Sequence, residues 1–317
     1  DYAVDLADFL ISRGATLDAC SAARLGRLDA RSAIVRSDPR RVHERGGDGK
    51  TPLHWAATIE TAEFLLESGA DINARDVYHE STPLQYLIRE HQDVARLLVA
   101  RGADADIFAA AALGDLARAR KLLDADPSCV AMTVSRRSFP MQNPRAGGII
   151  YIWTLGQHKR PHDVAQEFGH GAIRELLMER SSPVLRLAIA CEAGDESAIE
   201  RLQRERPALT KSLPDELLYS IVANAANSKL DVVRWMLRAG WPATAQEPGG
   251  VTALHWAAFH GNVEMARELL AHHASTEARD KTYDGRPIDW AQHGSENSWH
   301  RATGDYEAMK ILLGPSD

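Results

Sequence analysis

The chain has 317 residues, of which 44% are hydrophobic and 26% charged, and its formal net charge is −7. This composition is ordinary for a soluble globular protein, and it lacks the long basic run that is typical of nucleic-acid-binding segments. No apolar stretch approaches the roughly 20 residues that a membrane-spanning helix needs. We therefore expect neither a nucleic-acid partner nor a membrane partner.

The cysteine content indicates the redox environment. Cys20, Cys129 and Cys191 are widely spaced and odd in number, which argues against a disulfide framework and fits a reducing compartment. No signal peptide is visible, so we expect a cytoplasmic protein. The chain begins at Asp1 in the middle of a repeat and without an initiator methionine, so a leader or further repeats are expected before it.

In chain order, residues 1–18 predict the second helix of a repeat, and a divergent helix pair follows over residues 19–48. The next unit, from Thr51, is TPLHWAATIETAEFLLESGADINA, and it recurs from Thr82 as TPLQYLIREHQDVARLLVARGADAD. The pattern returns from Val251 as VTALHWAAFHGNVEMARELLAHHASTEA. Repetition with a period of about thirty residues is typical of a stacked helical solenoid.

These stretches, above all TPLHWAA and FLLESGADINA, resemble the ankyrin repeat. The resemblance implies an all-α, right-handed, curved ankyrin-repeat solenoid. We count about nine helix-pair repeats after a leading half repeat. The divergent units are similar to those of bacterial-type multi-repeat ankyrin proteins. The unit that begins at Thr51 lacks about three residues between its helices, so its first helix or the following turn must be shortened.

Two segments interrupt the repeats. Residues 131–159 match no repeat half and separate the N-terminal repeats (1–130) from the C-terminal repeats (160–317). Within this irregular insertion, Ile149–Trp153 is a short β-branched and aromatic run that predicts a strand or a buried loop. A second insertion, near 294–305, is polar. Long loops on a rigid scaffold are common places for functional sites.

The resemblance to ankyrin repeats implies a structural role for the histidine of the TPLH motif. In ankyrin repeats this residue, His54 and His255 here, hydrogen-bonds to backbone and ties neighbouring repeats together. A metal role would need other ligands at a suitable spacing, and none is nearby. HExxH, CxxC, phosphate-loop and nucleophile-elbow motifs are absent from the sequence. We assign no catalytic residue, metal or cofactor, and the leading expectation is a protein that is not an enzyme.

Aromatic residues follow this histidine, or its equivalent, in four repeats. Stacked repeats would align them in rows, where they either pack between the inner helices or form an aromatic wall for a ligand or peptide. The four residues are Trp55, Tyr86, Trp256 and Trp290.

Further binding candidates lie in a turn and in the insertions. The resemblance implies that the turn after the two alanines faces a concave groove, which would expose Phe259 beside His260. The insertions carry more aromatic side chains. In the first insertion these are Tyr151 and Trp153, and in the second they are Trp299 and His300.

The leading functional hypothesis is a non-enzymatic scaffold that binds a partner protein or peptide through the concave face and the insertions. In an alternative, both insertions enclose a pocket for an enzyme or small-molecule binder, with acid–base groups from His158, His293, His300 and Asp305. About five repeats separate the two insertions, which argues against a shared pocket. A third possibility is a structural repeat region of a larger protein.

Overall fold

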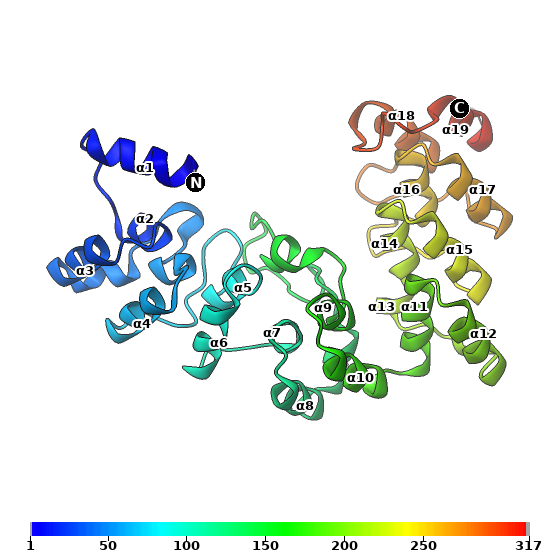
Figure 1. Ribbon diagram of the computed structural model, residues 1–317. Helices are drawn as coiled ribbons and strands as arrows, with labels where there is room; N and C mark the ends of the chain where they lie inside the picture. The colour runs from blue at the N-terminus through cyan, green and yellow to red at the C-terminus, as the bar shows by residue number, and fades with distance from the viewer. Residues whose placement is uncertain (1, 315–317) are drawn as a thin grey trace. The chain divides into compact units, whose positions relative to one another are not determined.

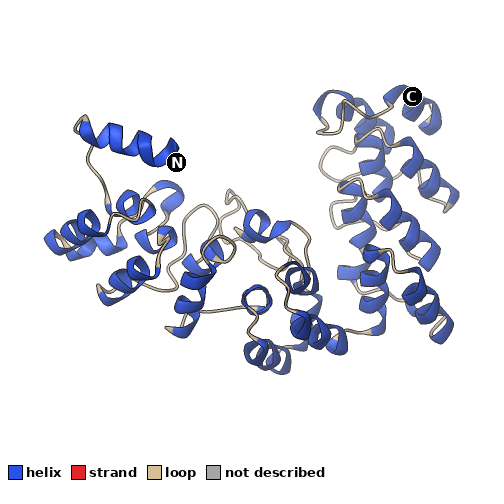
Figure 2. Ribbon diagram, viewed as in Figure 1, coloured by secondary structure: helices blue, strands red, loops and turns tan. Residues whose placement is uncertain are grey.

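A computed structural model of the chain describes residues 2–314. Within that range the regular elements are helices, as Figure 2 shows, with an isolated β-bridge between Gln246 and Thr252. The predicted all-α solenoid is confirmed, since nine helix pairs follow the single helix α1 (Tyr2–Ser12) in the described range. The chain divides into two compact units, Asp1–Arg180 and Ser181–Asp317. This division differs from the predicted one, because the first unit contains the insertion and the helix pair after it.

The first unit holds five helix pairs after α1 (Figure 1). They are α2 (Ala19–Arg24) with α3 (Leu28–Ser37), the 3-10 helix η3 (Pro52–Trp55) with α4 (Ile59–Glu67), α5 (Pro83–Leu87) with α6 (Gln92–Ala100), α7 (Ile107–Leu113) with α8 (Leu116–Ala125), and α9 (Pro161–Glu167) with α10 (Gly171–Arg180). Short elements between them are η1 (Pro39–His43), η2 (Gly47–Gly49), η4 (Pro127–Ala131) and the π-helix η5 (Ile152–Gly156). The brevity of η3 confirms the predicted shortening.

The second unit holds four helix pairs. They are α11 (Pro183–Ala193) with α12 (Glu196–Glu205), α14 (Ser220–Ala226) with α15 (Leu230–Ala239), α16 (Ala253–Phe259) with α17 (Val263–Ala271), and α18 (Pro287–Asn297) with α19 (Tyr306–Leu313). The short elements η6 (Leu209–Lys211) and α13 (Asp215–Leu218) precede α14. In residues 2–314 no helix is long and apolar enough to cross a membrane.

The inner helix of each pair is more deeply buried than the outer one. In α16, Ala253, Leu254, Ala257 and Ala258 have no exposed surface, because this helix packs against the inner helices on both sides, α14 and α18. Alanine allows helices to approach closely. The outer helix α17 buries one face only, formed by Met265, Ala266 and Leu269, as expected for an amphipathic helix.

The two insertions are more ordered than the sequence predicts. In the first, Ile149–Trp153 forms no strand. The alternative prediction, a buried loop, is correct for its first three residues, which form a buried turn that leads into η5. In the second, α18 continues to Asn297, so only residues 298–304 are irregular before the cap of α19. Gly294 permits this extension because its Cα packs directly on the backbone of α16.

The histidine of TPLH joins consecutive repeats. Nδ1 of His54 accepts a hydrogen bond from the Thr51 amide at 3.0 Å, and Nε2 donates to the Ser81 carbonyl of the next repeat at 3.0 Å. His255 makes the same two bonds, each at 3.1 Å. In the repeat that begins at Thr82, Gln85 replaces the histidine, and its side-chain oxygen accepts the equivalent amide bond at 3.0 Å.

We expect a His54→Gln variant to lose part of the acid sensitivity of the parent. Burial lowers the pKa of His54 from 6.5 to about 4, so the unfolded chain binds the proton more tightly than the folded chain. The contribution of the neutral ring is complete above about pH 6.5 and falls by about 3 kcal/mol as the pH approaches 4. Urea unfolding at about pH 7 and about pH 4 measures the difference. An equal loss of stability in parent and variant would contradict it.

We expect Gly294→Ala to destabilise the second unit. Alanine normally stabilises the interior of a helix by about 1 kcal/mol relative to glycine. At this position, however, a Cβ would lie 2.0 Å from the carbonyl oxygen of Phe259 in α16, so the helices would have to separate at a cost of about 1–3 kcal/mol. Gly171→Ala is the control, because a Cβ there meets open space. Thermal unfolding followed by circular dichroism should separate the two variants, and equal midpoints would refute the expectation.

Candidate binding surface

The second unit gathers tryptophan side chains from three segments. Trp256 comes from α16, Trp290 from α18, and Trp299 from the loop after α18. The ring centroids of Trp256 and Trp290 are 5.2 Å apart, and those of Trp256 and Trp299 are 6.1 Å apart. Trp256 and Trp290 are half-buried, whereas Trp299 is 63% exposed. We name these three residues the aromatic surface.

Phe259 is not the exposed contact that the sequence predicts. It is buried, and its ring lies 5.7 Å from Trp256 and 5.6 Å from Trp299. The hydroxyl of Tyr306 donates to the carbonyl oxygen of Phe259 at 3.1 Å. The second insertion thus folds over the turn that an uninterrupted repeat would leave open. Phe259 therefore packs against two rings of the aromatic surface, Trp256 and Trp299.

His260 is also buried, which corrects its prediction as a direct contact. Its Nε2 donates to the carbonyl oxygen of Ala226 at 2.9 Å, and its Nδ1 accepts from the Ser298 hydroxyl at 2.9 Å. The ring centroid lies 4.8 Å from that of Trp299. Burial lowers the pKa of His260, so the neutral ring that these bonds require is favoured. His260 therefore holds in place the loop that carries Trp299.

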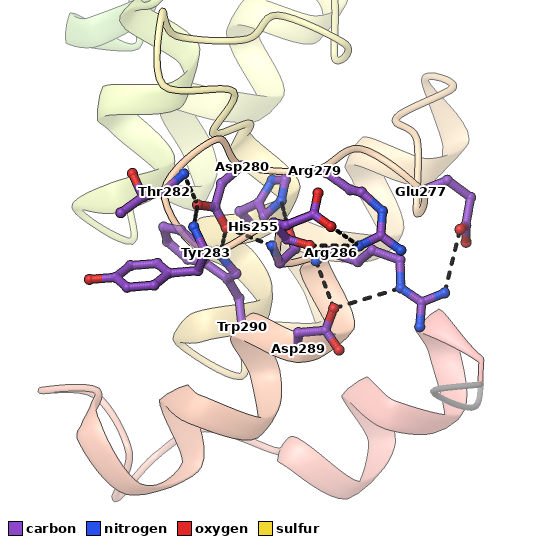
Figure 3. A network of polar contacts seen from close by, with 11 residues as sticks. His255, Glu277, Arg279, Asp280, Thr282, Tyr283, Arg286, Asp289 and Trp290 are labelled. Atoms are coloured by element: carbon purple, nitrogen blue, oxygen red, sulfur yellow. Dashed lines mark hydrogen bonds and ion pairs between the residues drawn. The ribbon is translucent and has the colours of Figure 1, made fainter.

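A buried carboxylate positions Trp290 and the loop before it. This loop, residues 279–286, is named finger 2 (Figure 3). Asp280 accepts hydrogen bonds from Nε1 of Trp290 at 2.9 Å and from three backbone amides of finger 2. Burial by itself would raise the pKa of Asp280, but these hydrogen bonds outweigh it and lower the pKa. The ring of Tyr283 points away from this network and is 82% exposed.

Asp280 was missed by sequence reasoning, although a signal for it exists. The tripeptide Ala-Arg-Asp stands at the start of the loop in two repeats, at 74–76 and at 278–280. An aspartate that recurs at the same position of a loop of the same length indicates a side chain that accepts hydrogen bonds from the loop backbone. The aspartate accepts loop amides in both places.

The four acid–base candidates of the alternative pocket differ in exposure and in the structural element that carries them. His293 is exposed on α18, and His300 is half-buried with its ring centroid 4.9 Å from that of His260. Asp305 caps α19 by accepting an amide bond at 2.9 Å, and His158 belongs to the first unit. In the part of the chain that the structure describes, no three His, Cys, Asp or Glu side chains are grouped closely enough to hold a metal ion.

The aromatic pair of the first unit encloses a cation of its own chain. Nζ of Lys50 lies 4.5 Å from the ring centroid of Trp55 and 4.6 Å from that of Tyr86, a cation–π arrangement. It also forms an ion pair with Asp48 at 3.1 Å. Trp55 and Tyr86 thus have an internal partner that the sequence analysis did not identify. Val251 occupies the equivalent of Lys50 in the second unit.

Tyr151 in the first insertion is fully buried, which corrects its prediction as a binding residue. Its ring centroid lies 5.8 Å from that of Phe108 and 5.7 Å from that of Phe139. Its hydroxyl donates to the carboxylate of Asp106 at 3.1 Å. Tyr151 therefore anchors the insertion. Trp153 of the same insertion is 59% exposed, and its ring centroid lies 4.7 Å from that of His79.

A cavity of about 1210 Å³ in the first unit is lined by residues within 75–85, 102–106 and 138–149 and by Arg118 of α8. Three of its four carboxylates stabilise the surrounding backbone, since Asp76, Glu80 and Asp106 each accept backbone amide hydrogen bonds. Burial raises the pKa of Asp106 in spite of these bonds. None of the four acid–base candidates is among the residues that line this cavity.

Comparison with known proteins identifies the repeats. The family model for ankyrin repeats (three copies) matches residues 19–109, 187–280 and 220–316. The chain is 44% identical over 54 residues to the serine/threonine-protein kinase VIK of Arabidopsis thaliana, a match that covers 16% of this chain and 12% of that protein.

Two animal proteins are similar to other stretches. The ankyrin repeat and LEM domain-containing protein 1 homolog of Caenorhabditis elegans is 34% identical over 82 residues, 26% of this chain and 12% of that protein. The ankyrin repeat and SAM domain-containing protein 6 of Rattus norvegicus is 31% identical over 96 residues, 29% of this chain and 11% of that protein. The chain thus spans only about an eighth of the length of these relatives. Because the family model matches more than half of the chain, the chain belongs to the ankyrin-repeat family.

Proposed function

We propose that the chain is a protein-recognition scaffold whose main contact site is the aromatic surface of the second unit. Ankyrin repeats are in general protein–protein interaction modules, and the family match extends through this unit. The single observation that carries the choice of site is Trp299, a tryptophan that is 63% exposed although it stands on a well-ordered loop. Tryptophan is among the residues that contribute most to binding energy at protein interfaces.

The surroundings of Trp299 support this proposal. The Ser298 hydroxyl bonds to His260, and the amide of Ser298 donates to the Gly294 carbonyl at 2.9 Å. The Trp299 ring also packs against the rings of His260 and Phe259, at 4.8 and 5.6 Å between centroids. These contacts favour one position of the indole before a partner arrives, so that little conformational entropy is lost when the interface forms. Trp256 and Trp290 extend the apolar area beside it. A partner that covers all three rings would bury the exposed face of Trp299 against a rigid base.

We expect Trp299→Ala to weaken partner binding at least about tenfold, because the substitution removes the exposed anchor. The immobilised full chain captures proteins from a cell extract of the source organism, and the affinity of each captured protein is then measured with purified material. Trp153→Ala is a matched control, since that tryptophan is 59% exposed and lies on the other insertion.

The two variants distinguish the outcomes. A partner that binds the parent and Trp153→Ala equally, and Trp299→Ala more weakly, supports the proposed site. A partner that binds Trp299→Ala as tightly as it binds the parent would refute it. Circular dichroism of each variant checks that the helices are intact.

A further inference from the structure

The cavity of the first unit arises from the unequal lengths of two connections. The connection from α4 to α5 spans residues 68–82 and includes the loop of residues 75–82, which we name finger 1. The connection from α6 to α7 spans only residues 101–106 and has no room for a loop of this length. The first insertion lies over the gap, so the cavity of about 1210 Å³ has walls from both the repeats and the insertion.

Hydrogen bonds hold the insertion against finger 1. The carboxylate of Glu80 accepts the amides of Gln142 and Asn143 at 2.8 and 2.7 Å. Further along the insertion, the amide of Gly147 donates to the Tyr78 carbonyl at 2.7 Å. The cavity is therefore formed by the protein alone, as small-molecule sites usually are.

Acidic side chains outnumber basic ones in the cavity wall. The charged residues that line it are four acids and two arginines, namely Asp76, Glu80, Asp104, Asp106, Arg75 and Arg118. Backbone amides donate to two of the acids, three to Asp76 and two to Glu80. The excess of negative charge favours a cationic ligand over an anionic one.

The two arginines of the wall already bond to other groups. Nη1 of Arg75 donates to the carbonyl oxygen of Glu80 at 2.8 Å, and Nε of Arg118 donates to the carboxylate of Asp115 at 3.2 Å. The insertion adds no Lys or Arg to the lining, although residues 131–159 contain four. Its basic residues therefore do not cancel the negative charge of the wall by direct contact.

Two carboxylates of the wall have no cationic partner. Oδ1 of Asp106 accepts the Ala109 amide at 2.9 Å and the Tyr151 hydroxyl at 3.1 Å, and both donors are neutral. Burial raises the pKa of Asp106 in spite of these bonds, so a cation beside it would stabilise the ionised form. Asp104 is exposed, and its carboxylate forms no hydrogen bond or ion pair with any residue within 2–314.

Apolar side chains lie on the insertion side of the cavity. Phe139 and Met141 are half-buried there, and Ile149 is buried. The ring centroid of Phe139 lies 5.7 Å from that of Phe108 and 5.7 Å from that of Tyr151, so its position is fixed by packing. The cavity thus combines carboxylates from the repeats with an apolar surface from the insertion.

We propose that this cavity is the binding site of a small aliphatic diamine. One ammonium group is held by Asp106 and the other by Asp104, and the methylene chain between them packs against Phe139 and Met141. The site lies in the first unit and takes a small molecule, so it goes beyond the protein contact proposed for the second unit.

Isothermal titration calorimetry of the full chain tests the proposal with cadaverine, pentanediol and glutarate, which have the same chain length and end in ammonium, hydroxyl and carboxylate groups. The variants are Asp104→Asn, Asp106→Asn and Asp195→Asn. Asparagine at position 106 keeps an acceptor for the Ala109 amide and removes the charge. Asp195 is the matched control, because it caps α12 of the second unit with the same kind of bond, from the Ala198 amide at 3.0 Å.

We expect one molecule of cadaverine to bind per chain, with equal affinity for the parent and Asp195→Asn. Asp106→Asn should weaken binding at least about tenfold and Asp104→Asn about threefold, because each loses a charge-assisted bond. Pentanediol and glutarate should not bind. Asp104→Asn keeps the test decisive if Asp106→Asn fails to fold, since the Asp104 carboxylate has no partner in the described range.

Three contrary results would each overturn the proposal. The first is no saturable binding of cadaverine to the parent, or equal binding to the parent, Asp104→Asn and Asp106→Asn. The second is binding of pentanediol or glutarate as tight as that of cadaverine, which would exclude the cationic class. The third is an equal loss of affinity in Asp195→Asn, which would show a response to the net charge of the chain and not to this cavity.

The pH dependence gives a second readout for Asp106. The ammonium group requires the ionised carboxylate, so affinity should fall as the pH is lowered toward the raised pKa of Asp106, and binding in that range should release a proton. Titrations in two buffers of different ionisation enthalpy measure this proton. Its persistence in Asp106→Asn would contradict the assignment. Trp299→Ala should bind cadaverine as the parent does, so this inference and the proposed function can fail separately.

Discussion

Close stacking of the inner helices is the constraint on which the rest of this structure depends. A single ankyrin pair is too small to bury its own apolar face, so each inner helix must be covered by its neighbours. Alanine at four buried positions of α7, Ala109–Ala112, and glycine at 294 show how near the backbones come to one another. Because of that spacing, residues at equivalent positions of successive inner helices lie next to one another. The tryptophans of α16 and α18 are in contact for this reason.

The two units use this position of the repeat in different ways. In the first unit Lys50 lies between Trp55 and Tyr86, and an internal cation occupies the aromatic faces. In the second unit Val251 takes the place of Lys50, and Trp256 packs edge-on against Trp290. The insertions increase this difference. One places Trp153 against His79 in the loop of residues 75–82, whereas the other raises Trp299 into solvent beside Trp256.

The fold could be predicted from the sequence because repeats are local. TPLHWAA occurs with its helix cap, its histidine and its alanines within seven residues, and the bonds of His54 follow from that motif and the repeat length. The shortened η3 could be predicted from a count of residues. The candidate binding surface was harder to predict from the sequence. Exposure of Phe259 was inferred from an ordinary repeat, but the insertion forty residues later buries it. Tyr151 is buried by Phe108, which belongs to another repeat. Such contacts depend on how an irregular loop folds back, and no periodicity encodes that path.

The side chain that accepts the cap amide of an inner helix also decides whether that cap responds to acid. His54, Gln85 and His255 occupy one position in three repeats, but an amide takes up no proton in the range in which imidazole does. Acidification therefore removes the amide bonds that Nδ1 of His54 and Nδ1 of His255 accept from Thr51 and Thr252, while the cap at Thr82 keeps its bond. The distribution of histidine and glutamine along the solenoid thus determines which inner helices lose a cap bond in acid, and α5 keeps its bond where η3 and α16 lose theirs.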